Sequence, residues 1–404
     1  MNVDTLRFAD RYLGLPLCWL LTIVRVLAKP FTHRSTRPKP RNVLTIKLSE
    51  MGSTVLACPA FRELERRFDC DLYFVAFIEN SAIFRELQIA PESHTIIVDT
   101  RSAWKLIRSG LKAVRTLRRI GIDTTIDMDF FSRFAAVLAY LVCRGNRVGF
   151  AGFTDEGHGR GSLLTHPVMY SPHIHTSEAF MALVSALEPG YSGEILYKGS
   201  VRDADYSLPE FKPSEEALTS IREKLSKHGV REKEHRLILV NPNSSDIFPL
   251  RKWPLTNFSS FCTTLLNENV SLYIAITGST SERIQAERMA REINHERCFS
   301  LAGGTTFAEL LALYACSDLM LTNDSGPAHF AGLLNLPRIV LFGPETPRLY
   351  RPIGGDVRCM YSNFACSPCV SVYNAKKSPC QNNRCLQVIT VEDVLREARD
   401  LLGE

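Results

Sequence analysis

Residues 319–342 read Leu319-Met-Leu-Thr-Asn-Asp-Ser-Gly-Pro-Ala-His-Phe-Ala-Gly-Leu-Leu-Asn-Leu-Pro-Arg-Ile-Val-Leu-Phe342. The apolar runs at its two ends, 319–322 and 338–342, have the composition of buried strands. Between them, turn residues lead into a helix that we expect over 327–334, with Pro327 at its first position. A strand, a helix and a second strand in this order predict parallel strands in an α/β sheet.

The same alternation fills most of the chain in two rounds. The first predicts strands at 43–48, 72–77, 95–98 and 124–128, helices at 54–68, 102–119, 132–143 and 177–187, and a glycine-rich loop at 145–161. The second predicts strands at 237–240, 272–277, 299–302, 319–322 and 338–342, and helices at 214–228, 256–267, 281–292, 306–316 and 327–334. We therefore predict an α/β protein of two Rossmann-like domains, 41–195 and 214–404, with a linker at 196–213 and parallel sheets that face a central cleft.

Composition and charge narrow the possible partners. The chain has 404 residues, of which 45% are hydrophobic and 23% are charged, as in ordinary globular proteins. Its net charge of +5 is unevenly spread, because residues 11–49 contain Lys and Arg but no Asp or Glu. A basic end on an otherwise balanced chain favours an anionic surface as a partner and argues against nucleic acid.

Residues 1–40 combine this basic stretch with an apolar run at 13–24. The run is shorter than the roughly 20 apolar residues that cross a bilayer. Leucines recur at helical spacing, Trp19 suits the headgroup level, and basic residues follow. We therefore predict a helix that lies in the interface of an anionic membrane, with the protein peripheral on the cytoplasmic face. A signal peptide and a helix packed on its own domain are the alternatives.

The turn after the strand at 319–322 is the most informative candidate site. Asp324 and Ser325 are typical helix-capping residues, and free N–H groups at a helix start suit a diphosphate. His329 would lie one turn into the helix and face the same site. An ordinary capped helix is the alternative.

Two further strand-end loops contain residues suited to phosphate. After the strand at 237–240, serine hydroxyls can donate to phosphate oxygens and a basic pair can supply charge. After the next strand, a Gly-Ser turn is a weaker signal. The candidate residues are Ser244, Ser245, Arg251, Lys252, Gly278 and Ser279. A polar loop with an incidental basic pair is the alternative.

In order and spacing, these segments resemble the lipopolysaccharide heptosyltransferases, which are family 9 of the glycosyltransferases. The resemblance covers about residues 42–400. It is carried by Lys47-Leu-Ser-Glu-Met-Gly-Ser-Thr-Val-Leu56, Arg251-Lys-Trp-Pro254, Gly278-Ser279, Leu301-Ala-Gly-Gly-Thr305 and, above all, Asn323-Asp-Ser-Gly-Pro-Ala-His329 leading to Leu341-Phe-Gly-Pro344.

The resemblance implies the GT-B architecture, with the acceptor on the N-terminal domain and a nucleotide-sugar donor on the C-terminal domain. It implies inverting transfer of a sugar, heptose from ADP-heptose in the best-known members, to lipopolysaccharide core or a similar lipid-linked glycan, with no metal or other cofactor required. The same fold using another nucleotide sugar is the alternative.

The resemblance also implies roles for individual residues. The donor phosphates would lie against Ser244, Ser245, Arg251 or Lys252 and the backbone of Ser325-Gly326. Asp324 would hold sugar hydroxyls, and His329 would support the loop.

One position departs from the family pattern. In the family, the residue after the glycine of the first loop is an aspartate thought to deprotonate the acceptor, and here that residue is Ser53. A serine without a partner is a poor base, so Glu50, in the same loop, is the candidate replacement. The alternatives are that Glu50 is a solvated loop carboxylate, or that the protein is catalytically silent and only binds a glycan or nucleotide sugar.

The predicted helix at 102–119 has a basic face. Lys105, Arg108, Lys112, Arg115 and Arg119 follow one another at helical spacing. Such a face fits a phosphorylated lipid-linked glycan or anionic headgroups, and a solvated face is the alternative.

Four of the 12 cysteines form a pattern near the C-terminus. Cys366 and Cys369 make a CxxC pair, and Cys380 and Cys385 follow it. A structural zinc with four thiolates fits the first pair well and the second loosely. Free or redox-active thiols, a structural zinc and disulfides all stay open, and none of the three makes the cluster catalytic.

Overall fold

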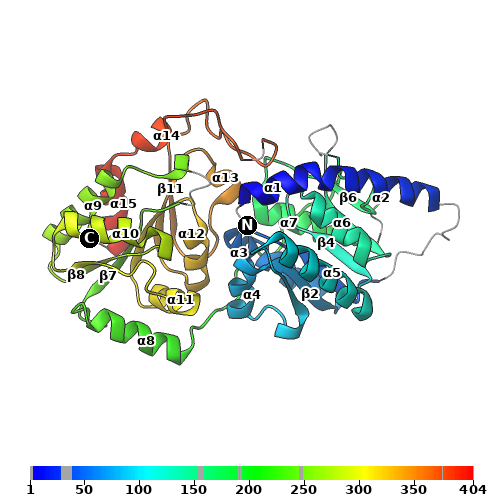
Figure 1. Cartoon of the computed structure of the whole chain (residues 1–404). Helices are drawn as coiled ribbons and strands as arrows, with labels where there is room; N and C mark the ends of the chain where they lie inside the picture. The colour runs from blue at the N-terminus through cyan, green and yellow to red at the C-terminus, as the bar shows by residue number, and fades with distance from the viewer. Residues whose placement is uncertain are drawn as a thin grey trace. The chain divides into compact units, whose positions relative to one another are not determined.

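The computed structural model describes residues 3–28, 39–152, 159–189, 191, 193–244, 249–374 and 376–403. The chain divides into two compact units, Met1–Tyr206 and Ser207–Glu404, and the division falls inside the segment predicted as a linker. Each unit is a sheet with helices on both faces (Figure 1).

The first unit is built on a six-stranded sheet in the order β3-β2-β1-β4-β5-β6, and every ladder in it is parallel. The strands are β1 (Asn42–Ile46), β2 (Asp71–Phe77), β3 (Thr95–Val98), β4 (Thr124–Asp127), β5 (Asn146–Ala151) and β6 (His166–Met169). Alternate β1 side chains point to opposite faces, yet both Val43 and Leu44 are fully buried. Helices must therefore cover both faces of the sheet. Because side chains on both faces are buried, the sequences of these strands are continuous apolar runs.

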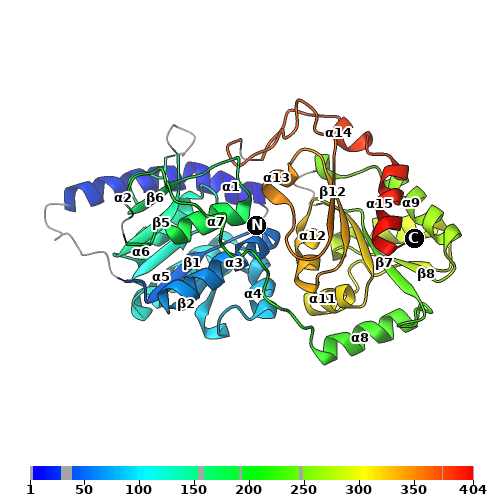
Figure 2. The ribbon, with the colours of Figure 1, turned by 180° about the vertical axis from the view of Figure 1, so that it is seen from behind.

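Helices α5 (Ala103–Ile120) and α6 (Arg133–Val142) share one apolar cluster with β1, β2 and β3. Helices α3 (Met51–Phe68) and α7 (Thr176–Ser185) contact each other, and the view from behind shows them clearly (Figure 2). The short α4 (Ser81–Leu87) follows β2.

Two N-terminal helices, α1 (Val3–Tyr12) and α2 (Gly14–Ala28), pack on α6 as an almost continuous helical stretch (Figure 1). Cys18 is fully buried in a cluster with Ala136 and Val137 of α6. Asp10 pairs with Arg133 at 3.2 Å. The helix predicted in this segment is thus present, and one of its faces packs on its own domain.

The sequence-based argument that this segment is too short to cross a bilayer counted residues 13–24 and missed α1. Thr5–Ala28 has 24 residues and is long and apolar enough to span a membrane, by length and composition alone. Polar contacts hold it against the unit, however. Arg25 donates to the carbonyl of Leu164 at 3.2 Å, in addition to the Asp10–Arg133 pair.

The second unit has a parallel sheet in the order β12-β11-β10-β7-β8-β9. Its strands are β7 (Arg236–Asn241), β8 (Leu272–Ile276), β9 (Cys298–Ser300), β10 (Leu319–Asn323), β11 (Arg338–Phe342) and β12 (Val357–Tyr361). Counted from the start of each unit, both sheets have the Rossmann order 3-2-1-4-5-6. The predicted α/β class with two Rossmann-like domains is therefore confirmed, while the cleft stays a prediction.

The helices of the second unit are α8 (Glu215–Ser226), α9 (Leu255–Glu268), α10 (Arg283–Ile293), α11 (Phe307–Ala315), α12 (Gly326–Phe330), α13 (Pro347–Tyr350), α14 (Arg384–Gln387) and α15 (Val391–Leu402). Side chains of α9, α10 and α15 pack with the central strands in one large core.

The structure corrects two predicted elements. The supposed glycine-rich loop begins with strand β5, which was missed because it contains the buried Arg147 and a glycine. A Cβ at Gly149 would lie 3.2 Å from both Asp127 and Leu164, so this glycine marks close packing within the sheet and not a loop. The helix predicted at 327–334 is the five-residue α12 followed by a 3₁₀ turn, Ala331–Leu334.

Candidate donor and acceptor sites

The strand order reverses at one point in each sheet, between β1 and β4 in the first and between β7 and β10 in the second. Ligands of open parallel sheets bind outside the carboxyl ends of the strands at such a point. Glu50 and Ser53 follow β1, Ser244 follows β7 and Asp324 follows β10. Within each unit, the predicted site residues thus lie at the end of the sheet where the topology favours a ligand.

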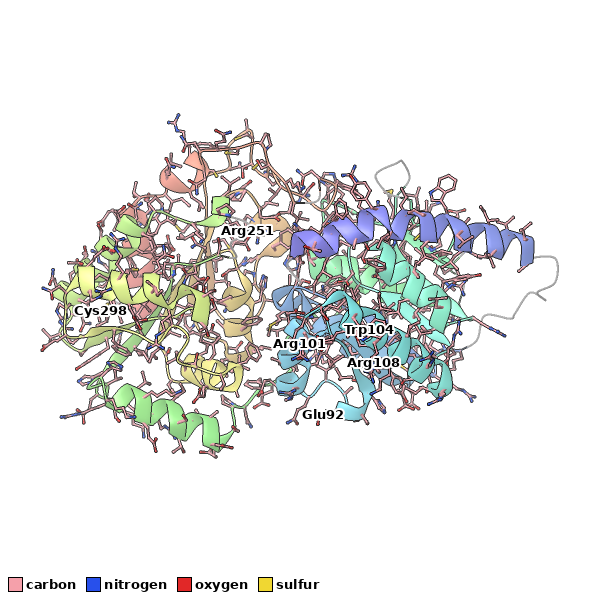
Figure 3. The ribbon with its side chains drawn as sticks, viewed as in Figure 1. Glu92, Arg101, Trp104, Arg108, Arg251 and Cys298 are labelled. Atoms are coloured by element: carbon pink, nitrogen blue, oxygen red, sulfur yellow. The ribbon has the colours of Figure 1, made fainter. Side chains whose placement is uncertain are left out.

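In the second unit, a guanidinium lies between two carboxylates. This guanidinium belongs to Arg251, which is labelled in Figure 3. Its Nη2 lies 2.7 Å from Oε1 of Glu345, and its Nε lies 3.7 Å from Oδ2 of Asp324. Asp324 is 4% exposed and Glu345 is fully buried. Arg251 follows β7, Asp324 follows β10 and Glu345 follows β11, so three strand-end loops meet at this guanidinium.

Glu345 was not predicted as a site residue. Burial raises the pKa of this carboxyl to about 7, although Arg251 and Lys376 oppose the shift, and the nearby charge of Asp324 adds to it. Within the described residues, Oε2 of Glu345 has no hydrogen-bond partner. Glu345 follows the predicted strand at 338–342, so its position in a strand-end loop could be read from the sequence. A carboxylate repels phosphate, however, and therefore gave no reason to include the residue in a phosphate site.

Asn323, at the end of β10, joins the loops of this site. Its Oδ1 accepts from the backbone N–H of Trp253 at 3.0 Å, and its Nδ2 donates to the carbonyl of Pro242 at 2.9 Å. Trp253 is buried, and its indole N–H donates to the carbonyl of Ile389. The carbonyl of Lys252 accepts from Asn383 at 2.8 Å. Hydrogen bonds with Asn323 and Asn383 thus hold the backbone next to Arg251 and Lys252 in place.

The remaining predicted donor residues differ in outcome. Ser244 is buried, and Ser245 lies outside the described residues. Ser325 is the N-cap of α12, but its side chain makes no capping bond and donates instead to the carbonyl of Asn323 at 3.1 Å. The N–H groups of Ser325 and Gly326 open the helix, where backbone donors have no intrahelical acceptor. His329 is buried within α12.

The Gly278-Ser279 turn has a local structural role. The hydroxyl and the backbone N–H of Ser279 both donate to Oε2 of Glu282, in a capping box that starts the 3₁₀ turn Thr280–Glu282. A Cβ at Gly278 would lie 2.8 Å from Nδ2 of Asn243, so glycine permits a close approach to the loop after β7. Ligand binding by these two residues stays a prediction.

At the switch point of the first unit, the central charge is already neutralised. Lys47 is 1% exposed and donates to Oδ1 of Asp129 at 3.1 Å, while Oδ2 accepts from the N–H of Leu48 at 2.9 Å. Burial raises the pKa of the Asp129 carboxyl, and the Lys47 charge opposes this shift. Both groups were missed as site residues, because nothing in the sequence pairs a lysine with an aspartate 82 residues away.

Glu50 is the N-cap residue of α3, and it is close enough to this pair for its charge to raise the pKa of the Asp129 carboxyl further. It is exposed, and its φ of 67° places a non-glycine residue in the left-handed region. Such a conformation costs about 1–3 kcal/mol and tends to occur at functional sites. Ser53 is buried, and its hydroxyl has no hydrogen-bond partner among the described residues. Of the two candidate bases, Glu50 is the one open to solvent.

The structure bears on the three alternatives for the C-terminal cysteines. All 12 cysteines of the chain are free, so disulfides are absent. In the part of the chain that the structure describes, no group of three or more His, Cys, Asp or Glu could hold a metal ion. The zinc prediction is therefore not supported. Burial raises the pKa of the Cys385 thiol, with smaller effects from Cys369, Cys380 and Cys366.

Comparison with known proteins gives the family. Residues 111–378 match the model of glycosyltransferase family 9 (heptosyltransferase). Lipopolysaccharide heptosyltransferase 3 of Escherichia coli K12 is 23% identical over 359 residues, which are 87% of this chain and 96% of that protein. Lipopolysaccharide heptosyltransferase 2 of Salmonella typhimurium LT2 is 28% identical over 113 residues, 27% of this chain and only 32% of that protein.

A solved structure confirms the fold. The E. coli ADP-heptose lipopolysaccharide heptosyltransferase II has a TM-score of 0.67 at 19% identity and aligns over 90% of this chain and 98% of its own. The family match spans well over half of the chain and confirms the family that the sequence motifs resemble. The chain therefore belongs to glycosyltransferase family 9, the heptosyltransferase family.

Proposed function

We propose that this chain transfers heptose from ADP-heptose, with inversion, to lipopolysaccharide core or a similar lipid-linked glycan. The observation that carries the proposal is the Arg251 site: a guanidinium held at the switch point of a Rossmann sheet, beside the N–H groups that open α12. Relatives named for lipopolysaccharide heptosyl transfer, and a similar structure named for ADP-heptose, support the choice of substrates.

The proposed reaction is a direct displacement. The acceptor hydroxyl oxygen forms a bond to the anomeric carbon while the bond from that carbon to the diphosphate oxygen breaks. Glu50 takes the hydroxyl proton. Arg251, Lys252 and the N–H groups of Ser325 and Gly326 stabilise the negative charge on the departing ADP. Asp324 orients sugar hydroxyls, and Ser53 is the weaker candidate for the base.

A second candidate function, binding without catalysis, is favoured by the serine at position 53, where the family has an aspartate. If no residue replaces the family aspartate, the chain would bind a nucleotide sugar or glycan without turning it over. The buried hydroxyl of Ser53, without a partner among the described residues, supports no catalytic role of its own.

The experiment is calorimetric titration with ADP, UDP and GDP, followed by turnover of the matching nucleotide heptose or hexose with lipid-linked acceptors. We expect tight binding of ADP and release of ADP from ADP-heptose. Tighter binding of UDP or GDP than of ADP would mean that the donor is a UDP-sugar or a GDP-sugar and not ADP-heptose. Binding without turnover, with competent acceptor present, would support the silent binder.

We also propose that the protein is peripheral on the cytoplasmic face of the membrane through α1 and α2. The face of these helices turned away from α6 is apolar, and Leu13, Trp19, Leu20 and Leu27 are each more than half exposed. Because the opposite face is packed and hydrogen-bonded, a helix lying in the membrane plane keeps both sets of contacts. Leu20→Glu with Leu27→Glu should release the protein from anionic vesicles, and equal vesicle binding by this variant would refute the proposal.

A further inference from the structure

Exposed apolar side chains are concentrated on one layer of the first unit. Eighteen large hydrophobic residues are exposed among those described, and thirteen of them lie on α1–α2 or on α5. Those on α5 are Trp104, Ile107 and Leu111, which are 71%, 56% and 51% exposed. Their spacing of three and four residues puts them in one ridge along the helix. A contiguous ridge of this kind marks an interaction surface, whereas isolated exposed hydrophobics do not.

The three helical elements of this layer are neighbours. Helix α6 contacts α2 and also α5, and α5 and α6 share a core with the sheet. Figure 3 labels Trp104 and Arg108 on the N-terminal part of α5, with Arg101 just before it. The α5 ridge therefore belongs to the same helical layer as the apolar face of α2.

The charge on α2, α5 and α6 has one sign, whereas α1 contains Asp4 and Asp10. Helices α2, α5 and α6 contain no Asp or Glu, while α5 alone has six basic residues: Lys105, Arg108, Lys112, Arg115, Arg118 and Arg119. Among the described residues, none of these six forms an ion pair with a carboxylate of the protein. Like charges at i and i+4 on a helix are mildly destabilising, so α5 keeps its charges without internal compensation.

A solvated helix in the same protein looks different. On α10, Arg283 pairs with Glu287 and Arg288 pairs with Glu292, each at 2.7 Å. That helix has a single large exposed hydrophobic, Ile284. The combination on α5, an exposed tryptophan ridge flanked by unpaired cations, is the pattern of a helix that meets anionic lipid.

We infer that α5 is a second membrane-contact element, and that the α2–α6–α5 layer faces an anionic bilayer with Trp104, Ile107 and Leu111 at headgroup depth. The inference rests on the proposed membrane location and adds to it the face that the first unit turns to the lipid. Trp104 supplies an amphipathic ring for the interface, and the basic residues attract the lipid phosphates.

The test uses the full-length chain with Trp19→Phe, so that Trp104 is the exposed tryptophan and Trp253 stays buried. Vesicles of phosphatidylcholine are compared with vesicles containing about 30% phosphatidylglycerol, an anionic fraction chosen so that basic residues near the surface attract it. We expect the anionic vesicles to shift the emission of Trp104 to the blue and brominated lipid to quench it. These vesicles contain no glycan, so binding identifies the lipid headgroup and not a phosphorylated acceptor as the partner.

Matched variants separate α5 from the rest of the surface. Trp104→Ser and Arg108→Glu should each weaken partitioning about tenfold, because one removes apolar burial and the other reverses a charge. Ile284→Ser and Lys227→Glu, in the second unit, are the controls and should leave partitioning unchanged.

Two results would overturn the inference, and they are distinguishable. If vesicle binding persists while Trp104 emission and the α5 variants show no effect, α5 is not a lipid contact but the membrane location through α1–α2 stands. If the protein binds neither vesicle type, the membrane location fails as well, while sugar transfer is tested separately by turnover.

Discussion

In the first unit, the switch point buries the ion pair Lys47–Asp129, and the exposed carboxylate of Glu50 is nearby. In the second unit, the guanidinium of Arg251 lies between two buried carboxylates. In the first unit, the charge of Lys47 is neutralised by Asp129 inside the protein. The carboxylate of Glu50, by contrast, is exposed to solvent. In the second, Arg251 is held by two acidic groups, and the charge of Lys376 also acts on Glu345, so an incoming anion would compete with these carboxylates for the guanidinium. The same sheet topology thus supports two different proposed roles, proton abstraction in the first unit and diphosphate binding in the second.

The largest effect should come from the accessible carboxylate. Glu50→Gln removes the proposed base, and loss of a general base lowers the rate by about 10²–10⁴. We expect kcat to fall by this factor while the Kd for ADP is unchanged, because Glu50 is not in the donor unit. Steady-state kinetics and calorimetry measure the two quantities on the same sample.

A double variant sharpens this prediction. Ser53→Asp restores the family aspartate, and in the Glu50→Gln background it should recover part of the lost kcat. Full activity of the single Glu50→Gln variant would remove Glu50 from the mechanism.

The neutral pair should matter for stability more than for binding. Lys47→Met leaves the Asp129 carboxylate buried without its cation, and breaking a buried pair in this way costs about 3–5 kcal/mol. Chemical denaturation should show this loss in the free energy of unfolding. In the double variant with Asp129→Asn, much of the loss should disappear; an equal loss in both proteins would mean that the pair itself is not responsible.

Sequence reasoning found what is local and missed what is paired at a distance. The strand-end motif at 323–329 and the basic residues at 251–252 were identified because each is a short continuous segment, whose residue types alone suggest phosphate binding. Asp129 and Glu345 were missed because each pairs with a cation that is distant in the sequence. Lys47 lies 82 residues from Asp129, and Arg251 lies 94 residues from Glu345. Strand β5 was missed because a buried Arg147 gives it the polarity of a loop, whereas its guanidinium donates to the carbonyls of Leu163 and Cys143.

On the donor side, Arg251→Ala should weaken ADP binding by about 10–100-fold, the range expected for losing a charge-assisted hydrogen bond. The variant also removes the guanidinium that lies between Glu345 and Asp324, so lower stability is expected. Arg251→Ala combined with Glu345→Gln should recover stability but not ADP affinity. Undiminished affinity in both proteins, measured by calorimetry, would exclude Arg251 from the phosphate site.

The smallest expected effect is a pH dependence of ADP binding that arises from Glu345. Because the pKa of Glu345 is about 7 in the folded protein, above its ordinary value of 4.5, its contribution to stability is fully present below pH 4.5 and is lost as the pH rises through 7. A diphosphate beside Arg251 adds negative charge near this carboxyl and favours its protonated form. ADP binding near pH 7 should therefore take up part of a proton, and affinity should fall a few-fold between about pH 6 and pH 8.

Calorimetry in buffers of different ionisation enthalpy measures this proton uptake directly. ADP itself titrates in the same range, so the comparison is with Glu345→Gln, which removes the carboxyl but leaves the phosphate chemistry unchanged. A smaller proton uptake in Glu345→Gln, with ADP still bound, would assign the linkage to Glu345. Equal uptake in the two proteins would show that Glu345 stays in one protonation state when the donor binds, and that the two carboxylates around Arg251 serve only to hold it in place.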